Sequence, residues 1–357
     1  MSFETKVLAD SISDKGVRLT TVEATYPRIV HSELMTHRVF SRNSASTRAI
    51  PLKNHLGNLL FRPFIPEKFG INQPGMQAYE HLAGMKHEQA VEIWLAGRDR
   101  ALTTTLELVL GREAMADLCD YDPTHEHVSE LTLMEEFDNI TAALPKSTDT
   151  IDLNETTLLN VHKQLAGRGL EAYMWHTVII SGTEWDNFFG LRVHPDAQGE
   201  IATSARLTQK AIEASEPRLL RPGEWHLPLV DKDEFESFHD GIKASAARCA
   251  AVSYNRHNRK SFDREVERYQ QLIEGGHMSP LEHQATPFDD LDWRIVKSKD
   301  EIVQEAVATA GTDGRVNRHY DKHAENNALL GNLRGWIQHR KQIDHEDDFS
   351  QIKKVSE

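Results

Sequence analysis

The stretch from His37 to Arg48, with the sequence HRVFSRNSASTR, carries the strongest chemical signal in the chain. It places one histidine and three arginines among short hydroxyl and amide side chains, with few carboxylates near. Arginine binds phosphate through two parallel hydrogen bonds, and hydroxyl and amide groups complete the oxygen contacts. The stretch therefore predicts a phosphate-ester or nucleotide site, although a solvated basic loop would have the same composition.

Two further stretches bring polar groups to turns. The segment SGTEWDNFFGLR runs from Ser181 to Arg192, and its aromatic residues are as typical of a core as of a cofactor platform. The segment GGHMSPLEH runs from Gly275 to His283 and carries two histidines in what is otherwise a helix-ending turn. Both stretches are candidates for binding residues.

Several other chemistries lack their signature. No phosphate-binding loop, dinucleotide-binding glycine motif or nucleophile elbow is present. Neither Cys119 nor Cys249 has an activating neighbourhood, which argues against a nucleophilic thiol. The histidine groupings are His125-Glu126-His127 and the pair His319 and His323, and neither has the spacing of a zinc site. We therefore predict no metal.

Composition narrows the class of protein. The 357 residues include 41 basic and 55 acidic side chains, for a net charge of −14. This excess of acid argues against bulk nucleic-acid binding, which needs clustered lysine and arginine. The N-terminus lacks the apolar core of a signal peptide, and no apolar run is long enough to span a membrane. We expect a cytoplasmic protein that handles a small ligand, in a bacterial or phage-infected cell.

Periodicity predicts the elements that must position these residues. One or two strands are expected over 17–30, a helix over 31–40 and a loop over 41–48. Two helices are expected within 156–189, the second of them carrying Trp175, Val178 and Ile179. The other expected helical regions are 81–110, an acidic excursion over 111–155, 196–214, 233–252 and 262–275. Prolines and a glycine over 215–230 mark a segment boundary.

Together the chemical stretches resemble the flavin-dependent thymidylate synthase family. Its signature, Arg-His-Arg-x-x-Ser-x-Asn-Glu-x-Ser-x-Arg-Tyr, is similar to the segment 36–49. The matching residues are His37, Arg38, Ser41, Asn43, Ser46 and Arg48. The departures are Thr36 for Arg, Ser44 for Glu and Ala49 for Tyr.

Other motifs of the family follow in an unusual order. Leu191-Arg192 with the run from Ala197 to Ile201 resembles one of them, and Gly276 to His283 resembles another. Residues 251–254, Ala-Val-Ser-Tyr, resemble a third. The last two usually precede the signature but here follow it, which resembles a circular permutation with its joint near 215–230.

The resemblance implies an α/β (α+β) fold with a mainly antiparallel sheet surrounded by helices. Residues 1–290 would form the permuted catalytic domain, with a helical insertion over 111–155, and 291–357 a C-terminal extension. It implies a homotetramer with shared sites, bound FAD, methylenetetrahydrofolate and a pyrimidine deoxynucleotide, and NADPH for a reductive methylation. Carried over residue by residue, the FAD contacts are His37, Arg38, Ser181, Gly182, Thr183, Asn187, His277 and Ser279. The nucleotide contacts are Glu33, Ser46, Arg48, Arg168 and Arg192.

The implied chemistry needs an activated pyrimidine carbon 5. Either a thiol adds at carbon 6 or a fixed cation stabilises an enolate-like ring. Because neither cysteine has an activating neighbourhood, the second route is favoured. Arg192 would be that cation, while Ser46 and Arg48 would position the sugar and phosphate. Ser46 as a nucleophile is an alternative without a visible base partner.

Three functions stay open. The first is methylation of dUMP to dTMP. The second is hydroxymethylation of dCMP or dUMP for modified viral DNA. It is suggested by Thr36, Ser44 and Glu33, because Glu33 replaces a usual Gln and a carboxylate accepts well from the cytosine amino group. The third is a nucleotide- or flavin-binding protein without catalysis.

Overall fold

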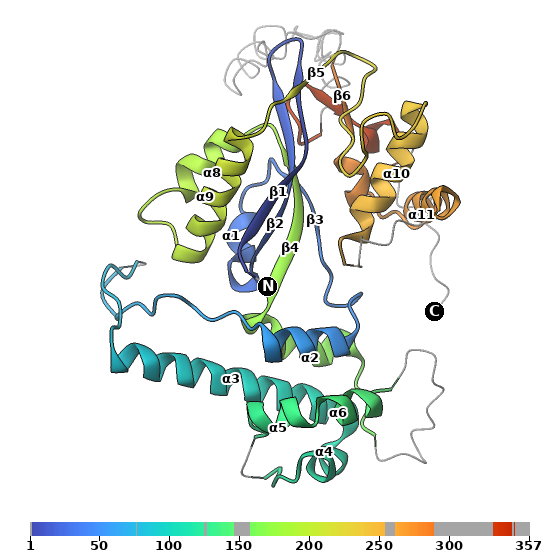
Figure 1. The fold of residues 1–357 in the computed structure, drawn as a ribbon. Helices are drawn as coiled ribbons and strands as arrows, with labels where there is room; N and C mark the ends of the chain where they lie inside the picture. Colours follow the sequence, from blue (N-terminus) through green and yellow to red (C-terminus); the bar gives the residue numbers. More distant parts are fainter. Residues whose placement is uncertain are drawn as a thin grey trace, which may run out of the picture.

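A five-stranded sheet in the order β3-β4-β2-β1-β5 organises the chain (Figure 1). The computed structural model describes residues 2–75, 77–124, 127–145, 158–253, 261–288, 331–344 and 346. The strands are β1 (Glu4–Ser13), β2 (Arg18–Pro27), β3 (Ser41–Ser44), β4 (Trp175–Gly182) and β5 (Arg218–Leu220). All neighbours pair antiparallel except β1 and β5, which are parallel. The protein is thus a mixed α/β protein with a mixed sheet.

The neighbouring interior strands β2 and β4 are covered on both faces. Because side chains alternate along a strand, Val178 and Ile180 enter one core, while Ile179 enters another. The first core also receives the aromatic side of α8 (Trp185–Arg192) and Ile201 and Ala205 of α9 (Gly199–Glu213). We call this side of the sheet the α8 face.

The opposite side, the α10 face, packs against α10 (Phe238–Ala250) and the short 3₁₀ helix η3 (Ala251–Ser253). The helix α11 (Phe262–Glu274) lies beside α10 (Figure 1). The short α1 (His31–Met35) lies on the α8 face, where Leu34 joins the core. The sheet therefore separates two helical layers, and each layer carries a different part of the predicted site.

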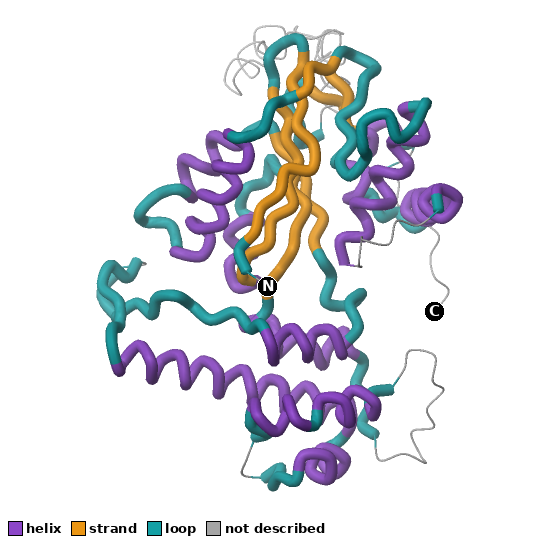
Figure 2. Tube along the Cα trace, viewed as in Figure 1, coloured by secondary structure: helices purple, strands orange, loops and turns teal. Residues whose placement is uncertain are grey.

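A third group of helices lies together beyond the end of the sheet where β4 begins (Figure 2). They are α2 (Leu52–Phe61), α3 (Met85–Leu110), α4 (Arg112–Cys119), α5 (Glu130–Glu135), α6 (Phe137–Ala143) and α7 (Lys163–Ala166). They share a core of their own, which includes Leu102, Leu106 and Met115. The predicted helix over 81–110 is confirmed as α3, and the described part of 111–155 is largely helical.

Three local predictions were wrong. Residues 175–182 form the strand β4, because the run Thr177-Val178-Ile179-Ile180 is β-branched and buried on both faces. The expected loop over 41–48 begins as β3, whose backbone pairs with β4. The expected helix over 31–40 ends at Met35. The strand β1 at the N-terminus was not predicted.

Residues 331–344, assigned from sequence to a C-terminal extension, pack into the body of the protein. The strand β7 (Trp336–Gln338) pairs antiparallel with β6 (Ala285–Pro287). Trp336 is fully buried and shares a core with Leu19 and Leu220. This segment is therefore part of the same packed unit as the sheet.

None of the described helices is both long enough and apolar enough to cross a membrane.

Candidate functional site

The guanidinium of Arg192, at the end of α8, is held by α1 and the residues just after it. Its Nε donates to Nε2 of His37 at 2.9 Å. Its Nη2 donates to Oγ1 of Thr36 at 3.0 Å and to the carbonyl oxygen of Glu33 at 3.2 Å. The Glu33 carboxylate lies 3.7 Å from Nη1. These four residues, which we call the Arg192 cluster, unite two of the stretches singled out in the sequence.

Core packing fixes the two sides of this cluster. Phe188 is buried one helical turn before Arg192, so both side chains lie on the same side of α8. The His37 ring packs edge-to-face against Phe188, with ring centroids 5.0 Å apart. The aromatic residues of this stretch therefore belong to the hydrophobic core, one of the two roles expected from the sequence. Their packing orients the Arg192 side chain toward His37.

Burial and charge set the protonation of the cluster. Burial, with Arg192 and Arg42 adding to it, lowers the pKa of His37. The neutral ring then accepts the hydrogen bond from Arg192 Nε on its Nε2. Burial raises the pKa of the Glu33 carboxyl, and the charge of Arg192 opposes that shift. The result is a fixed cation with a carboxylate beside it but not in hydrogen-bonding contact.

A second polar group is buried on the α10 face. Ser181 Oγ lies 2.6 Å from Thr21 Oγ1 and 2.8 Å from Nδ1 of His283. Thr21 Oγ1 is also 2.8 Å from Nε2 of His226, whose Nδ1 lies 2.8 Å from Ser11 Oγ. Burial lowers the pKa of His226 and of His283 to about 3, so both imidazoles are neutral. This chain of hydroxyl and imidazole groups joins β2 and β4 to the segment from Gly275 to His283, which we call the histidine run.

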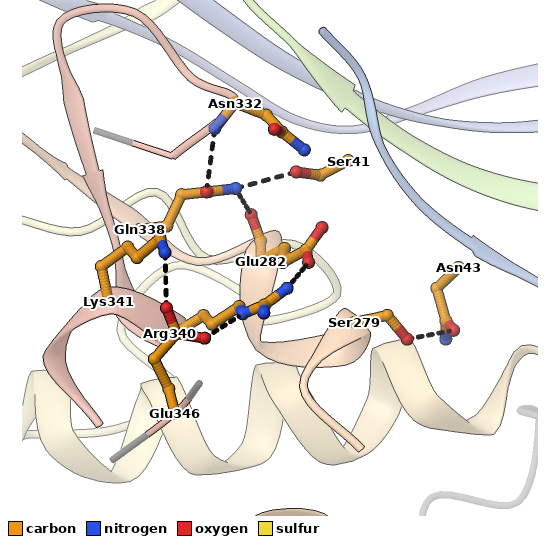
Figure 3. A network of polar contacts seen from close by, with 9 residues as sticks. All are labelled: Ser41, Asn43, Ser279, Glu282, Asn332, Gln338, Arg340, Lys341 and Glu346. Carbon is orange, nitrogen blue, oxygen red and sulfur yellow. Dashed lines mark hydrogen bonds and ion pairs between the residues drawn. The ribbon is translucent and has the colours of Figure 1, made fainter. Parts of the chain in front are cut away.

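The strand β3 lies within the signature-like segment 36–49, and we call it the signature strand. It also contacts the histidine run directly (Figure 3). Ser279 Oγ donates to Oδ1 of Asn43 at 3.4 Å, and Nδ2 of Asn43 donates to the carbonyl oxygen of Cys249 at 2.5 Å. Ser279 begins the 3₁₀ helix η4 (Ser279–Glu282), which contacts β3. All three chemical stretches therefore converge on the edge of the sheet formed by β3 and β4.

The other predicted residues fall into three groups. Arg38, Arg48, Asn187 and His277 are exposed. Gly182 and Thr183 follow Ser181 at the end of β4. A Cβ at position 182 would collide with the Phe40 ring. The buried Thr183 hydroxyl has no hydrogen-bond partner. Ser46 accepts from the Arg48 amide at 3.2 Å.

Arg168 is used in a surface ion-pair chain. Its guanidinium donates to Glu171 at 2.8 Å, and Glu171 also lies 3.1 Å from Arg28. Within the described part of the chain, Arg168 makes no hydrogen bond or ion pair with the Arg192 cluster. The geometry brings Arg192, Glu33 and His37 together, but it does not bring Arg168 to them.

The loop that carries Ser46 and Arg48 follows Ala45, which packs on the α10 face with Ile179 and Val252. The Arg192 cluster belongs to the α8 face. Ala45, just before this loop, and the Arg192 cluster thus pack on opposite faces of the sheet.

Two cavities lie in the described part of the protein. One of about 400 Å³ is lined by β1 and residues 230–238, and one of about 210 Å³ is lined by α2, Ala45, Ile50 and Trp175. Neither is lined by Arg192, His37 or Arg48. Neither of these cavities therefore encloses the predicted nucleotide residues.

Sequence reasoning gave no role to several residues that the fold brings to this region, namely Thr21, His226, Glu282, His283 and Gln338. Glu282 and His283 belong to the run that was singled out, so their motif was a usable signal. Gln338 lies 297 residues from Ser41, its hydrogen-bond partner, and has no local signal.

No group of three or more histidine, cysteine, aspartate or glutamate side chains able to hold a metal occurs in the described residues. His125, Glu126, His319, His323 and Tyr254 lie outside them. No protein-family model matches the chain, and no curated protein matches it in sequence.

Proposed function

We propose that this protein transfers a one-carbon unit from methylenetetrahydrofolate to carbon 5 of a pyrimidine deoxynucleotide, with FAD as cofactor and dUMP as the substrate converted to dTMP. The observation that carries the proposal is the convergence of three stretches, distant in sequence, on β3 and β4. Ser41 of the signature pairs with Ser181 across β3 and β4, and the histidine run meets Ser181 at His283 and β3 at Asn43. Beside this edge of the sheet, Arg192 meets the signature at His37.

The residues present fit a flavin dinucleotide in part. Thr183 offers a buried hydroxyl without a hydrogen-bond partner. Arg38 of the signature and His277 of the histidine run are both exposed. Ser181 is fully buried and hydrogen-bonded to Thr21 and His283, so its role is to fix β4 against the histidine run. When bound, the flavin supplies the redox chemistry of the transfer.

The Arg192 cluster supplies the polarisation of the pyrimidine. Carbon 5 becomes nucleophilic when negative charge is drawn onto the ring, and a cation already held in place stabilises that charge without reorganisation. Hydrogen bonds to His37, Thr36 and Glu33 orient the guanidinium before a ligand arrives. Substitution at carbon 5 releases its hydrogen as a proton, and methylation also consumes two reducing equivalents, supplied by NADPH.

We place the complete site between copies of the chain, in a homotetramer. Ala45, which precedes the loop of Ser46 and Arg48, packs on the α10 face, whereas the Arg192 cluster belongs to the α8 face. Two copies of the chain would each contribute one half of the site.

Release of tritium tests the proposed reaction at the reacting atom. The FAD-loaded protein is incubated with methylenetetrahydrofolate, NADPH and dUMP or dCMP labelled with tritium at carbon 5. We expect release of tritium to water from dUMP that depends on the folate. A folded protein that binds nucleotide and FAD but releases none from either substrate would support the non-catalytic reading.

A second candidate function is hydroxymethylation of dCMP, in which water rather than hydride completes the transferred group. The observation that favours it is the position of two departures from the family pattern. Glu33 and Thr36 both contact Arg192, the residue that would face the base. A carboxylate beside the base favours the amino group of cytosine. Glu33→Gln should then shift preference from dCMP toward dUMP, and Glu213→Gln, an exposed acid on α9, is the matched control.

A further inference from the structure

Gln338, near the C-terminus, connects the signature strand to the histidine run (Figure 3). Its Nε2 donates to Oγ of Ser41 at 2.8 Å and to the carbonyl oxygen of Glu282 at 2.8 Å. Its Oε1 accepts a hydrogen bond from the backbone N–H of Asn332 at 3.2 Å. The side chain is 2% exposed and uses both donors and its acceptor. A fully satisfied buried amide of this kind fixes the distance between the groups that it bridges.

Arg340 adds a charged contact to the same turn. It pairs with Glu282 at 2.5 Å and with Glu346 at 2.7 Å, and Lys341 also pairs with Glu346 at 2.5 Å. These groups are partly buried, where ion pairs are screened less than on an open surface. Glu282 is thus held at its backbone by Gln338 and at its carboxylate by Arg340.

The segment that carries these residues is anchored in the core. Trp336 is fully buried, and β7 pairs with β6 directly after the histidine run. Gly331, with φ of +57°, lies so close to the Gln338 amide that a Cβ there would overlap Oε1. The segment therefore has both a fixed position and a close approach that only glycine permits.

The contacted residues lie next to the predicted cofactor residues. Ser41 pairs in register with Ser181 across β3 and β4, and Asn43 on the same strand meets Ser279. Glu282 precedes His283, which hydrogen-bonds Ser181. A change in the spacing of Ser41 and Glu282 would therefore alter the geometry of Ser181 and Ser279 together.

We propose that Gln338 and Arg340 are positioning residues, and that residues 331–344 together with Glu346 form a strap that sets the spacing of β3 and η4 for cofactor binding. The identity of the cofactor as FAD rests on the proposed function; the strap itself rests on the contacts above. The nucleotide half of the site, around Arg192, lies on the α8 face, and among the described residues Arg192 makes its hydrogen bonds and ion pair with α1 and the residues after it rather than with the strap.

The test compares the full-length protein with Gln338→Leu, Arg340→Met and Gly331→Ala. The last variant displaces the Gln338 amide without changing its chemistry. Arg334→Met is the matched control, because Arg334 lies in the same segment but is 65% exposed in its ion pair with Glu184. Hydrogen exchange is measured over peptides covering 41–44 and 279–283, and FAD and dUMP affinities are measured by calorimetry.

We expect each strap variant to speed exchange in both peptides and to weaken FAD binding at least tenfold, with dUMP affinity within about twofold of the wild type. A uniform loss of both affinities would indicate general destabilisation and overturn the proposal. So would altered exchange confined to 331–346. If the wild type binds no FAD, the proposed function fails, and the two exchange peptides alone still decide whether the strap positions β3 and η4.

Discussion

Arg192 Nε donates a hydrogen bond to Nε2 of His37 at 2.9 Å, although the two residues are 155 positions apart. The bond requires an unprotonated Nε2, and the lowered pKa of His37 supplies it. The histidine therefore acts as an acceptor that orients a permanent cation. This relationship gives Arg192 a defined direction and makes it the first residue to change.

Replacing Arg192 by Ala should lower turnover by about 10²- to 10³-fold, the range found when one preorganised donor to a developing anion is removed. FAD affinity should change much less, because Arg192 itself is assigned to the nucleotide and, among the predicted FAD residues, hydrogen-bonds only His37. Steady-state kinetics with flavin titration measures both. Arg206→Ala, an exposed arginine on α9, is the control. Normal turnover of Arg192→Ala would remove Arg192 from the mechanism.

Arg48→Ala should weaken dUMP binding by about 10- to 100-fold, as expected for loss of a charged hydrogen bond worth about 1.5–3 kcal/mol. FAD binding should be nearly unchanged, and the exposed Arg62→Ala should alter neither affinity. Calorimetry with each ligand gives the comparison. An unchanged dUMP affinity would contradict the assignment of Arg48.

Shared sites make a separate prediction for these two variants. Assayed at a dUMP concentration well below the KM of Arg48→Ala, the Arg48→Ala and Arg192→Ala variants should each be nearly inactive alone. When the two are unfolded together and refolded as a mixture, some sites receive both intact halves, so activity should partly return. A mixture that refolds into mixed oligomers but stays as inactive as its components would place both arginines in one chain's site.

Much of the helical structure follows from the sequence, because its signals are local. The helices α3, α9, α10 and α11 lie within the ranges that periodicity predicted. Strand β4 was mistaken for a helix because a short apolar run has no period that separates a buried strand from a buried helix. Its β-branched residues favoured the strand. Strand β3 is polar and exists through its pairing with β4, which no local pattern reveals.

The candidate site divides in the same way. His37, Arg38 and Arg48 stand out because they are close in sequence. The partnership of Arg192 with Thr36 depends on packing of α8 against the sheet, and a motif comparison shows Thr36 only as a departure. The bridging role of Gln338 could not be predicted from the sequence. It depends on hydrogen bonds to Ser41 and Glu282, which only the fold brings close to this glutamine.

The two cysteines should be dispensable for turnover. Burial raises the pKa of the Cys119 thiol to about 11, and both thiols are buried, whereas addition to a pyrimidine requires an accessible thiolate. Cys119→Ala with Cys249→Ala should retain most activity, apart from a loss of stability. Kinetics after circular dichroism has verified folding measures this. An inactive but folded double variant would revive the thiol route.

Stability should rise with pH between about 3 and 6.5. Burial lowers the pKa of His226 and of His283 to about 3, against about 6.5 in the unfolded chain. The unfolded state binds more protons in this window, so the free energy of unfolding falls as pH falls, by up to about 1.4 kcal/mol per pH unit for each histidine. Urea unfolding at pH 5, 6 and 7.5 tests this, with His283→Gln expected to reduce the slope. Equal stability at pH 5 and pH 7.5 would contradict neutral burial of these rings.

Mass spectrometry of the products tests the central claim most directly. The FAD-loaded protein is incubated with methylenetetrahydrofolate and NADPH, and separately with dUMP and with dCMP. The proposed function predicts a methyl-sized gain on dUMP and none on dCMP. A hydroxymethyl-sized gain, above all on dCMP, would instead support the second function and point to Glu33 and Thr36. Unmodified dUMP and dCMP in the presence of bound FAD would contradict one-carbon transfer altogether.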